Sequence, residues 1–284
     1  MSKPTFNVSK PRISVVIPAY NEEEYLGTCL EAITDQAYKP FEVIVVDNGS
    51  LDQTVAIAQS FPGVRVVAEP THGIFAAVTT GFDEARGSII ARTDADSRPE
   101  ADWLEAIVKA FEDEALSALS GPIYYYDLPL AGLIRRGENF IRGRLAVHSG
   151  EAKFLTGANM AIRRPAWLEV KSKLCRRPGI HEDLDLAIHL QEDNRAIGFF
   201  SQVVVSTSAR RITAPFRSFY KYLDGYESIY LEHGIKRSWV LKVPFLCYVP
   251  FQPLIKIIYR LYNSNLNQAT LNKLVKLFIT DSNY

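Results

Sequence analysis

The stretch ARTDADSRP at residues 91–99 carries two aspartates, Asp94 and Asp96, shortly after the apolar pair Ile89 and Ile90. In extended backbone the side chains at i and i+2 project to the same side, so the two carboxylates can face one ligand. Such a pair can hold a hard divalent cation, Mn²⁺ or Mg²⁺, with phosphate oxygens and water filling the other positions. Aspartate is also common in solvated turns, and the spacing taken alone favours a turn. The rest of the sequence must decide between the two interpretations.

Two further segments place polar side chains where an apolar run ends. Asp47 closes the run FEVIVVD, and its oxygens can accept hydrogen bonds from a base or from ribose hydroxyls. The segment PAYNEEE offers Pro18 as a turn residue, Tyr20 as an aromatic that can lie against a base, and Glu22 as a ribose ligand. Simple turn chemistry is the alternative for Asp47. The acidic first turn of a helix is the alternative for Glu22.

A third group of charged residues lies later in the chain. In HEDLDL, Glu182 and Asp183 stand at an expected helix start, where a carboxylate is stabilised as an anion and can act as a general base. Helix capping is the alternative role for this pair. Arg210 and Arg211, in STSARRI, can match phosphate oxygens with their guanidinium groups, or can form a solvated basic turn.

Runs that suit strands alternate with runs that suit helices, which predicts βαβ units and a mostly parallel sheet. Strands are expected at 13–17, 41–47, 64–69 and 88–94, and helices at 21–36, 52–61, 74–86 and 101–113. Ligands of such sheets bind at the carboxyl ends of the strands. Asp47, Asp94 and the PAYNEEE turn are therefore expected to face one crevice.

The second half of the chain is less regular. We expect a strand at 154–164 that returns to the sheet edge, a helix at 181–198 and a strand at 199–212. The expected domain is residues 1–235, with one half at about 12–120 and another at about 121–235. Residues 236–284 form a separate basic and apolar segment.

The composition excludes several classes of protein. The formal net charge is zero, which does not suggest a nucleic-acid binder. Three cysteines without a CxxC motif do not form a disulfide framework and fit a reducing cytoplasm. The polar N-terminus carries no signal-peptide core, so a cytoplasmic location is expected.

The segment 236–284 holds seven basic residues against one acid, and its residues 243–255 are thirteen uncharged residues in a row. That run is shorter than the roughly 20 residues of a membrane-spanning helix. An apolar run with basic flanks suits the anionic inner face of a cell membrane, where the protein would be peripheral. Packing on the domain or on a second subunit is the alternative, which leaves a homo-oligomer open.

In order, the segments VVIPAYNEEEYLGTCLEAITDQ, EVIVVDNGSLDQT, THGIFAAVTTGFDEARGSIIARTDADSRPEADWL, TGANMAIRR and HEDLDLAIHL resemble the family 2 glycosyltransferases of the GT-A fold. The resemblance covers about residues 12–212. It implies an α/β, Rossmann-like fold with a mostly parallel central sheet and helices on both faces. The C-terminal segment would be a helical, membrane-associating addition.

The resemblance also implies roles for the residues singled out above. The nucleotide-sugar donor would be held by Pro18, Tyr20, Glu22, Asp47, Asp94 and Arg211. Asp94 and Asp96 would bind the divalent metal, Mn²⁺ or Mg²⁺, beside the donor diphosphate. Asp183 would be the catalytic base, and Glu182 would position the acceptor.

The implied activity is an inverting transfer of one sugar from a nucleotide-diphosphate sugar, UDP- or GDP-linked, to a lipid-linked or glycan acceptor in cell-envelope synthesis. Many family members carry Arg-Asn where this chain has Val78 and Thr79, which leaves the donor sugar open. The Q-x-x-R-W motif of processive synthases is absent, which favours transfer of a single sugar. A sugar nucleotidyltransferase and a non-catalytic membrane-associated relative are the alternatives. The acidic PAYNEEE turn argues against a triphosphate site, and the retained acids argue against lost activity.

Overall fold

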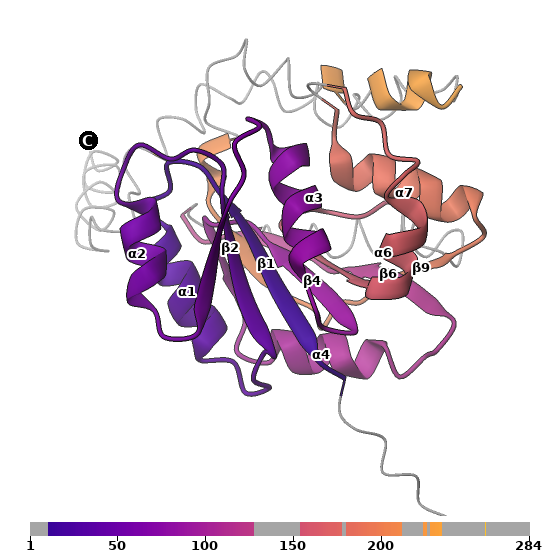
Figure 1. The fold of residues 1–284 in the computed structure, drawn as a ribbon. Coiled ribbons are helices and arrows are strands. Elements are labelled where there is room, and N and C mark those ends of the chain that lie inside the picture. The colour runs from indigo at the N-terminus through magenta and orange to yellow at the C-terminus, as the bar shows by residue number, and fades with distance from the viewer. Residues whose placement is uncertain are drawn as a thin grey trace, which may run out of the picture.

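The computed structural model describes residues 11–127, 154–177, 180–211, 224–225, 228–234 and 259. Their strands are β1 (Ile13–Ala19), β2 (Glu42–Asp47), β3 (Val64–Ala68), β4 (Ile89–Thr93), β5 (Ser97–Pro99), β6 (Leu116–Ser120), β7 (Ile123–Tyr125), β8 (Asn159–Arg163), β9 (Ala196–Phe199) and β10 (Val205–Thr207). The helices are α1 (Leu26–Thr34), α2 (Thr54–Ser60), α3 (Ile74–Glu84), α4 (Trp103–Ala110), α6 (Arg164–Val170), α7 (Glu182–Glu192) and the 3₁₀ turn η1 (Ala209–Arg211). Figure 1 shows them arranged around one central sheet.

The central sheet has seven strands in the order β3-β2-β1-β4-β8-β6-β9. Strand β8 runs antiparallel to both of its neighbours, β4 and β6, and the other pairs are parallel. The prediction of an α/β fold with a mostly parallel sheet is therefore confirmed. The strands of the first half also lie where the alternating pattern predicts them.

Three predictions for the second half are wrong in position or extent. The strand near 154–164 lies inside the sheet rather than at its edge, because Met160, Ala161 and Ile162 are buried and both sides of β8 are paired. The single strand expected at 199–212 is two strands in different sheets, separated by a turn in which the Val203 N–H donates to the Phe200 carbonyl. Helix α7 also ends before residue 198, since Asn194 takes a left-handed conformation with φ 54°.

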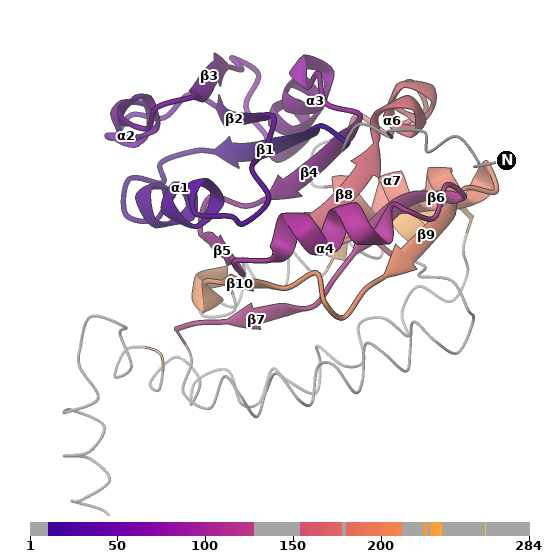
Figure 2. The same ribbon diagram turned by 90° about the horizontal axis from the view of Figure 1, so that it is seen from below.

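Helices cover both faces of the sheet, as expected, and each face has its own apolar core. Helices α1, α2 and α4 pack on one face, and α3, α6 and α7 on the other. Figure 2 shows α1 and α4 on the opposite side of the strands from α3 and α6. A Cβ added at Gly81 would lie 2.4 Å from Val16 Cγ1, so this glycine allows α3 to approach β1 closely.

A second, smaller sheet has the order β5-β10-β7 and begins directly after the two aspartates. Strand β10 pairs antiparallel with β5 and parallel with β7, which brings residues 205–207 beside residues 97–99. Residues 205–207, which come much later in the chain, therefore lie beside the segment that follows β4.

Within the described ranges, no helix is long and apolar enough to cross a bilayer. The segment 236–284, apart from Tyr259, lies outside those ranges, as do residues 128–153. The boundary between residues 1–235 and 236–284 and the division into halves stay predictions.

Candidate active site

The strand ends from which a crevice is predicted lie side by side at one edge of the central sheet. In the register of β1 and β2, Ala19 pairs with Asp47, so Tyr20 and Asp47 follow adjacent strand ends. Strand β4 lies on the other side of β1 and ends at Thr93, one residue before Asp94. The carboxyl ends of parallel strands meet at one edge of the sheet, which is where ligands of open α/β sheets bind.

Arg210 joins two of the predicted site acids. Its Nε donates to Asp96 Oδ2 at 2.7 Å, and its Nη2 donates to Glu22 Oε1 at 2.5 Å. Its guanidinium carbon lies 4.7 Å from the centroid of the Tyr25 ring. Burial raises the pKa of Glu22, and the hydrogen bond from Arg210 opposes that shift. The other Glu22 oxygen, Oε2, is buried and accepts no hydrogen bond from any described residue.

Asp96 is held by the small sheet. Its Oδ1 accepts a hydrogen bond from Thr207 Oγ1 at 3.2 Å, and its carbonyl accepts from the Ser208 N–H and from the Tyr126 hydroxyl. Asp94 is the more accessible aspartate of the pair, with 29% of its side chain exposed. Asp96 is therefore fixed to the protein, and Asp94 is the more open of the two to a ligand.

Arg92 connects the aspartate pair to the acids of α7, a role that motif spacing does not reveal. Its Nη2 lies 3.2 Å from Asp94 Oδ1, and its Nη1 lies 2.7 Å from Glu182 Oε1. Its side chain is only 3% exposed. A Cβ added at Gly157 would lie 2.6 Å from the guanidinium carbon, so the flat group needs a glycine at that position.

Glu182 and Asp183 occupy the first turn of α7 and differ in their partners. Asp183 Oδ2 accepts the Gly157 N–H at 2.7 Å, and its Oδ1 accepts the Leu184 N–H at 2.8 Å. Glu182 is committed to Arg92, and its burial raises its pKa while Arg92 opposes the shift. Both hydrogen bonds to Asp183 come from neutral backbone N–H groups. They hold its carboxylate in one orientation, which suits a general base.

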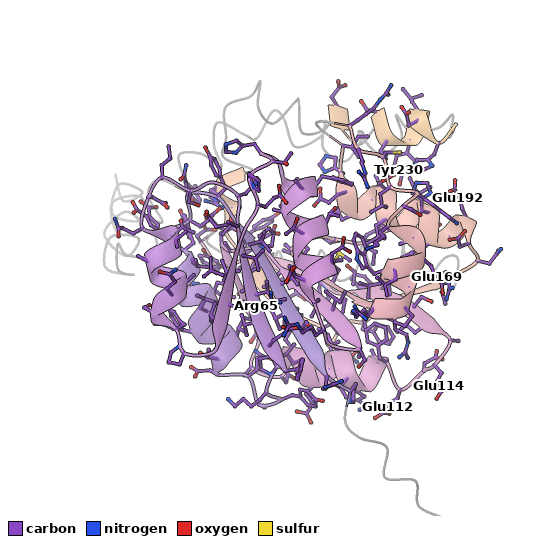
Figure 3. All side chains as sticks on the ribbon, viewed as in Figure 1. Arg65, Glu112, Glu114, Glu169, Glu192 and Tyr230 are labelled. Carbon is purple, nitrogen blue, oxygen red and sulfur yellow. The ribbon has the colours of Figure 1, made fainter. Side chains whose placement is uncertain are left out.

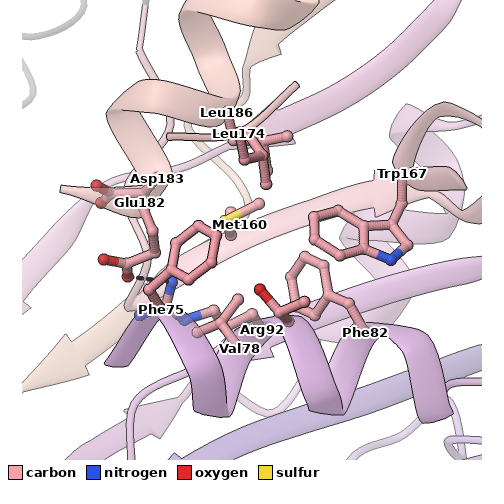
Figure 4. A pocket seen from close by; sticks show the side chains of 11 residues that line it. Phe75, Val78, Phe82, Arg92, Met160, Trp167, Leu174, Glu182, Asp183 and Leu186 are labelled. Atoms are coloured by element: carbon pink, nitrogen blue, oxygen red, sulfur yellow. Dashed lines mark hydrogen bonds and ion pairs between the residues drawn. The ribbon is translucent and has the colours of Figure 1, made fainter. Parts of the chain in front are cut away.

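A small cavity lies behind this pair (Figure 4). It measures about 10 Å³, about the size that one water molecule needs, so it cannot hold a sugar. Phe75, Val78 and Thr79 of α3 line it together with Glu182 and Asp183. The two positions that depart from the Arg-Asn of many family members therefore lie next to the acid pair.

The predicted nucleotide residues fall into different environments. Asp47 Oδ1 accepts the Ser50 N–H at 3.1 Å, and Asp47 is 9% exposed. Tyr20 is 48% exposed and meets His72 edge-on, with ring centroids 5.4 Å apart. Pro18 is buried within β1 opposite Val46, so it shapes the strand end and is not on the crevice surface.

His72 was missed by sequence reasoning, and Asn48 explains its position. The Asn48 side chain donates to the carbonyls of Glu69 and Thr71 and accepts the Gly73 N–H. These bonds hold the loop that carries His72 beside Tyr20. The sequence offers one signal of this loop arrangement, an asparagine directly after an expected strand.

Arg211 lies in η1, and its side chain is outside what the structure describes. Among the described side chains of this turn, Arg210 is the one that bonds to Asp96. Asp94, Asp96 and Glu22 present carboxylate oxygens alone, and Glu22 Oε2 is a buried acceptor. Such a hard donor set fits Mn²⁺ or Mg²⁺. Asp94 and Asp96 would hold the cation, and Asp96 also accepts a hydrogen bond from Arg210.

Comparison with known proteins shows which family and which relatives this chain resembles. The model of "Glycosyl transferase family 2" matches residues 14–169, more than half of the chain. Glycosyltransferase AglE of Haloferax volcanii is 36% identical over 122 residues, which are 40% of this chain and 40% of AglE. Glycosyltransferase GlyG of Streptococcus pneumoniae is 33% identical over 120 residues, again 40% of each chain. The matches span less than half the length of these curated relatives.

Solved structures share the fold at low sequence identity. Glucosyl-3-phosphoglycerate synthase from Mycobacterium tuberculosis, solved with Mn²⁺, uridine diphosphate and glucosyl-3-phosphoglycerate, superposes with a TM-score of 0.59. It is 20% identical, and the match covers 84% of this chain and 88% of that one. S. aureus TarS superposes with a TM-score of 0.54 at 16% identity, over 78% of this chain and 65% of TarS.

The fold is that of the GT-A glycosyltransferases. The chain belongs to glycosyl transferase family 2. The resemblance drawn from the sequence motifs is thereby confirmed.

Proposed function

We propose that this protein transfers one sugar from a nucleotide-diphosphate sugar to an acceptor hydroxyl, with inversion at the anomeric carbon. The observation that carries the proposal is the buried Arg92, which contacts an acid of the aspartate pair and an acid of α7 at once. It ties Asp94, a proposed donor-binding group, to the start of α7, the helix that carries the proposed base Asp183. Such fixed positioning is a main source of rate in transfer reactions.

Donor binding is assigned to the strand ends. Tyr20 and His72 offer aromatic surfaces for the base, and Asp47 offers a carboxylate oxygen for the base or ribose. A divalent cation held by Asp94 and Asp96 would neutralise charge on the departing diphosphate. Arg210, next to Asp96, is placed to add a second positive charge there. We propose UDP or GDP as the nucleotide.

Acceptor activation is assigned to Asp183. Its carboxylate would take the proton of the acceptor hydroxyl as the oxygen attacks the anomeric carbon from the face opposite the nucleotide. Glu182 would position the acceptor side indirectly, because its carboxylate is bound to Arg92. The bonds from the Gly157 and Leu184 N–H groups keep the Asp183 carboxylate in place before reaction.

We further propose a lipid-linked or glycan acceptor at the cytoplasmic face of the cell membrane, with a role in cell-envelope synthesis. The support is the run of thirteen uncharged residues at 243–255 within a segment of seven basic residues and one acid. Basic residues beside an apolar run favour anionic lipid surfaces. A homo-oligomer formed through the same segment is the competing use of that surface.

The central experiment measures release of nucleotide diphosphate from UDP-, GDP- and dTDP-sugars by the full chain, with Mn²⁺, with Mg²⁺ and with chelator. Metal-dependent hydrolysis of one donor is expected. Asp96→Asn should lower it by at least about a hundredfold, the scale of losing a metal or charge-stabilising group. Glu112→Gln, a change of an exposed acid after α4 (labelled in Figure 3), is the matched control and should keep the parental rate.

Two outcomes would contradict the proposal. Release of pyrophosphate from a nucleoside triphosphate and a sugar phosphate would favour a nucleotidyltransferase. Absence of donor binding by calorimetry for all three nucleotides, with Mn²⁺ present, would favour a non-catalytic relative.

A further inference from the structure

A second cluster of metal-ligating side chains lies on α7 and two neighbouring segments, and none of its four residues lines the cavity described above. Asp185 and His189 are one turn apart on α7, Cys175 follows α6, and His233 ends the short helix at 228–232. One ligand atom from each of the four residues lies within 4.8 Å of the others. Three segments that are separate in sequence therefore converge on one point.

Asp185 is the centre of the cluster and is fully buried. Its Oδ1 lies 2.9 Å from His233 Nε2 and 3.6 Å from His189 Nε2, and its Oδ2 accepts the Cys175 N–H at 2.7 Å. The Nε2 of His189 is buried and has no hydrogen-bond partner among the described residues. A buried polar atom without a partner is costly, so its position calls for a ligand.

Both histidines are oriented by the same carboxylate. His189 Nδ1 lies 2.9 Å from Glu192 Oε2, and His233 Nδ1 lies 3.3 Å from Glu192 Oε1. Each ring is thus held at Nδ1, which leaves both Nε2 atoms directed towards Asp185. Metal-binding histidines are held by carboxylates at the far nitrogen in this way.

The surroundings are apolar. Leu184, Ile188 and Ile229 are buried in one cluster, against which Cys175, Ile180 and Tyr230 pack. Figure 3 labels Tyr230 on the short helix and Glu192 near the end of α7, the two elements that the cluster joins. An apolar shell limits water access and strengthens binding of a cation by its ligands.

A metal-free interpretation explains only part of this arrangement. A protonated His233 beside the Asp185 carboxylate would form a buried ion pair. In that interpretation the Cys175 thiol bonds to Asp185, but His189 Nε2 is left without a hydrogen-bond partner among the described residues. A cation bound by all four groups satisfies each of them.

We propose that Cys175, Asp185, His189 and His233 bind one zinc-class divalent cation that fixes the helix at 228–232 to α7. Thiolate and imidazole donors favour Zn²⁺ over Mn²⁺ or Mg²⁺. Tetrahedral zinc places ligand atoms about 3.3–3.8 Å apart, given bond lengths of about 2.0–2.3 Å. The Asp185–His233 contact of 2.9 Å would open slightly, and the contacts that reach 4.8 Å would close by about an ångström. Because four protein ligands fill the coordination, this site would be structural.

The site would stabilise α7, the helix that carries Glu182 and Asp183. Asp185 is two residues after Asp183 on the same helix, so the cation would hold the start of α7 and its neighbours in register. It differs from the proposed catalytic site in donor chemistry, which allows the two to be tested separately.

The test loads the full chain, purified with reductant, with Zn²⁺ or Co²⁺ and removes free metal by desalting. One equivalent of retained zinc is expected. The cobalt form should show a thiolate-to-cobalt charge-transfer band and the visible bands of tetrahedral Co²⁺. Removing the metal with chelator should lower the Tm by several degrees, since binding to the folded state alone stabilises it.

Variants separate this site from other metal binding. Cys175→Ser should abolish the charge-transfer band, and His233→Gln should reduce retained zinc at least tenfold. Cys29→Ala, which removes a buried thiol elsewhere, and Asp96→Asn should keep both signals. Less than a tenth of an equivalent of zinc on the parent chain, or an unchanged band in Cys175→Ser, would overturn the proposal, whatever the donor assays give.

Discussion

Arg92 and Arg210 each join two acids of the active site, but they lie in different environments. Arg92 is 3% exposed and lies between Asp94 and Glu182, while Arg210 is 37% exposed and lies between Asp96 and Glu22. Neighbouring acids raise the pKa of both guanidinium groups against the effect of burial, so both are charged.

The difference in burial separates a permanent counter-ion from an exchangeable one. Removing one partner of a buried pair leaves an uncompensated charge, so Arg92 cannot leave its acids without a large cost. Arg210 is itself more exposed, although its partners Glu22 and Asp96 are each 12% exposed, so its ion pairs are more hydrated than those of Arg92 and easier to replace. We expect Arg92 to hold the two halves of the site together and Arg210 to respond to the donor and the cation.

The largest expected effect concerns the acceptor side that Arg92 organises. Asp183→Asn removes the base, and kcat should fall by about 10²- to 10⁴-fold. The amide oxygen can accept only one of the Gly157 and Leu184 N–H groups, so the Tm should fall modestly while the donor KM changes little. Steady-state kinetics with the preferred donor measures this, with Glu112→Gln as the control. A kcat within threefold of the parent would remove Asp183 from the mechanism.

The second prediction compares the two arginines directly. Arg92→Met should lower the free energy of unfolding by about 3–5 kcal/mol, because it leaves Glu182 and Asp94 unpaired. Arg210→Met should lower it by less than about 1 kcal/mol. Urea denaturation of both variants gives the comparison, and Arg92→Lys should fall between them. Equal losses in the two methionine variants would refute the distinction between permanent and exchangeable counter-ions.

A smaller effect is expected for Arg210 in donor binding. Arg210→Gln should raise the KM for the donor by about ten- to a hundredfold, the scale of one charge-assisted hydrogen bond to a phosphate. Its effect on kcat should be smaller. The ratio of the two changes, measured at saturating Mn²⁺, sharpens the comparison with Arg92. An unchanged KM would mean that Arg210 stays on Glu22 and Asp96 during the reaction.

The smallest expected effect is a pH dependence of stability. The folded-state pKa of Glu182 is raised by burial, so its contribution is fully present below its ordinary value of 4.5 and is lost as the pH rises through the folded value. The parent should therefore lose stability relative to Glu182→Gln between pH 4.5 and neutrality. Thermal unfolding of both proteins across that range measures the difference. A parent that gains on the variant with rising pH would mean that Arg92 outweighs burial.

Local patterns predicted the first half of the fold and the ends of its strands. Alternating apolar and amphipathic runs depend on neighbours a few residues apart, and they identified β1 to β4 and the helices between them. The position of β8 between β4 and β6 depends on pairing across long stretches of chain, which periodicity does not encode. The same limit explains why one expected strand at 199–212 is two strands in two sheets.

The acids of the site were predictable, and their partners were not. Asp94, Asp96, Glu182 and Asp183 stand in short motifs, so sequence alone identifies them. The bond between Arg92 and Glu182 spans 90 residues, and that between Arg210 and Asp96 spans 114. An arginine in a strand usually points to solvent, so nothing local marks Arg92 as buried. The cluster of Cys175 and His233 likewise depends on contacts between segments that are distant in sequence, which no local motif marks.

The antiparallel strand β8 has a consequence for the order in which the molecule is made. Strands β4 and β6 do not pair with each other, and each pairs with β8. Neither pairing can form until residues 159–163 have emerged from the ribosome. Until then, the nascent chain presents the edge of β4, with Ile89, Ile90 and Ala91, to other chains. Unpaired apolar edges favour association. A chain shortened before residue 159 should therefore aggregate, although it already contains Asp47, Asp94 and Asp96.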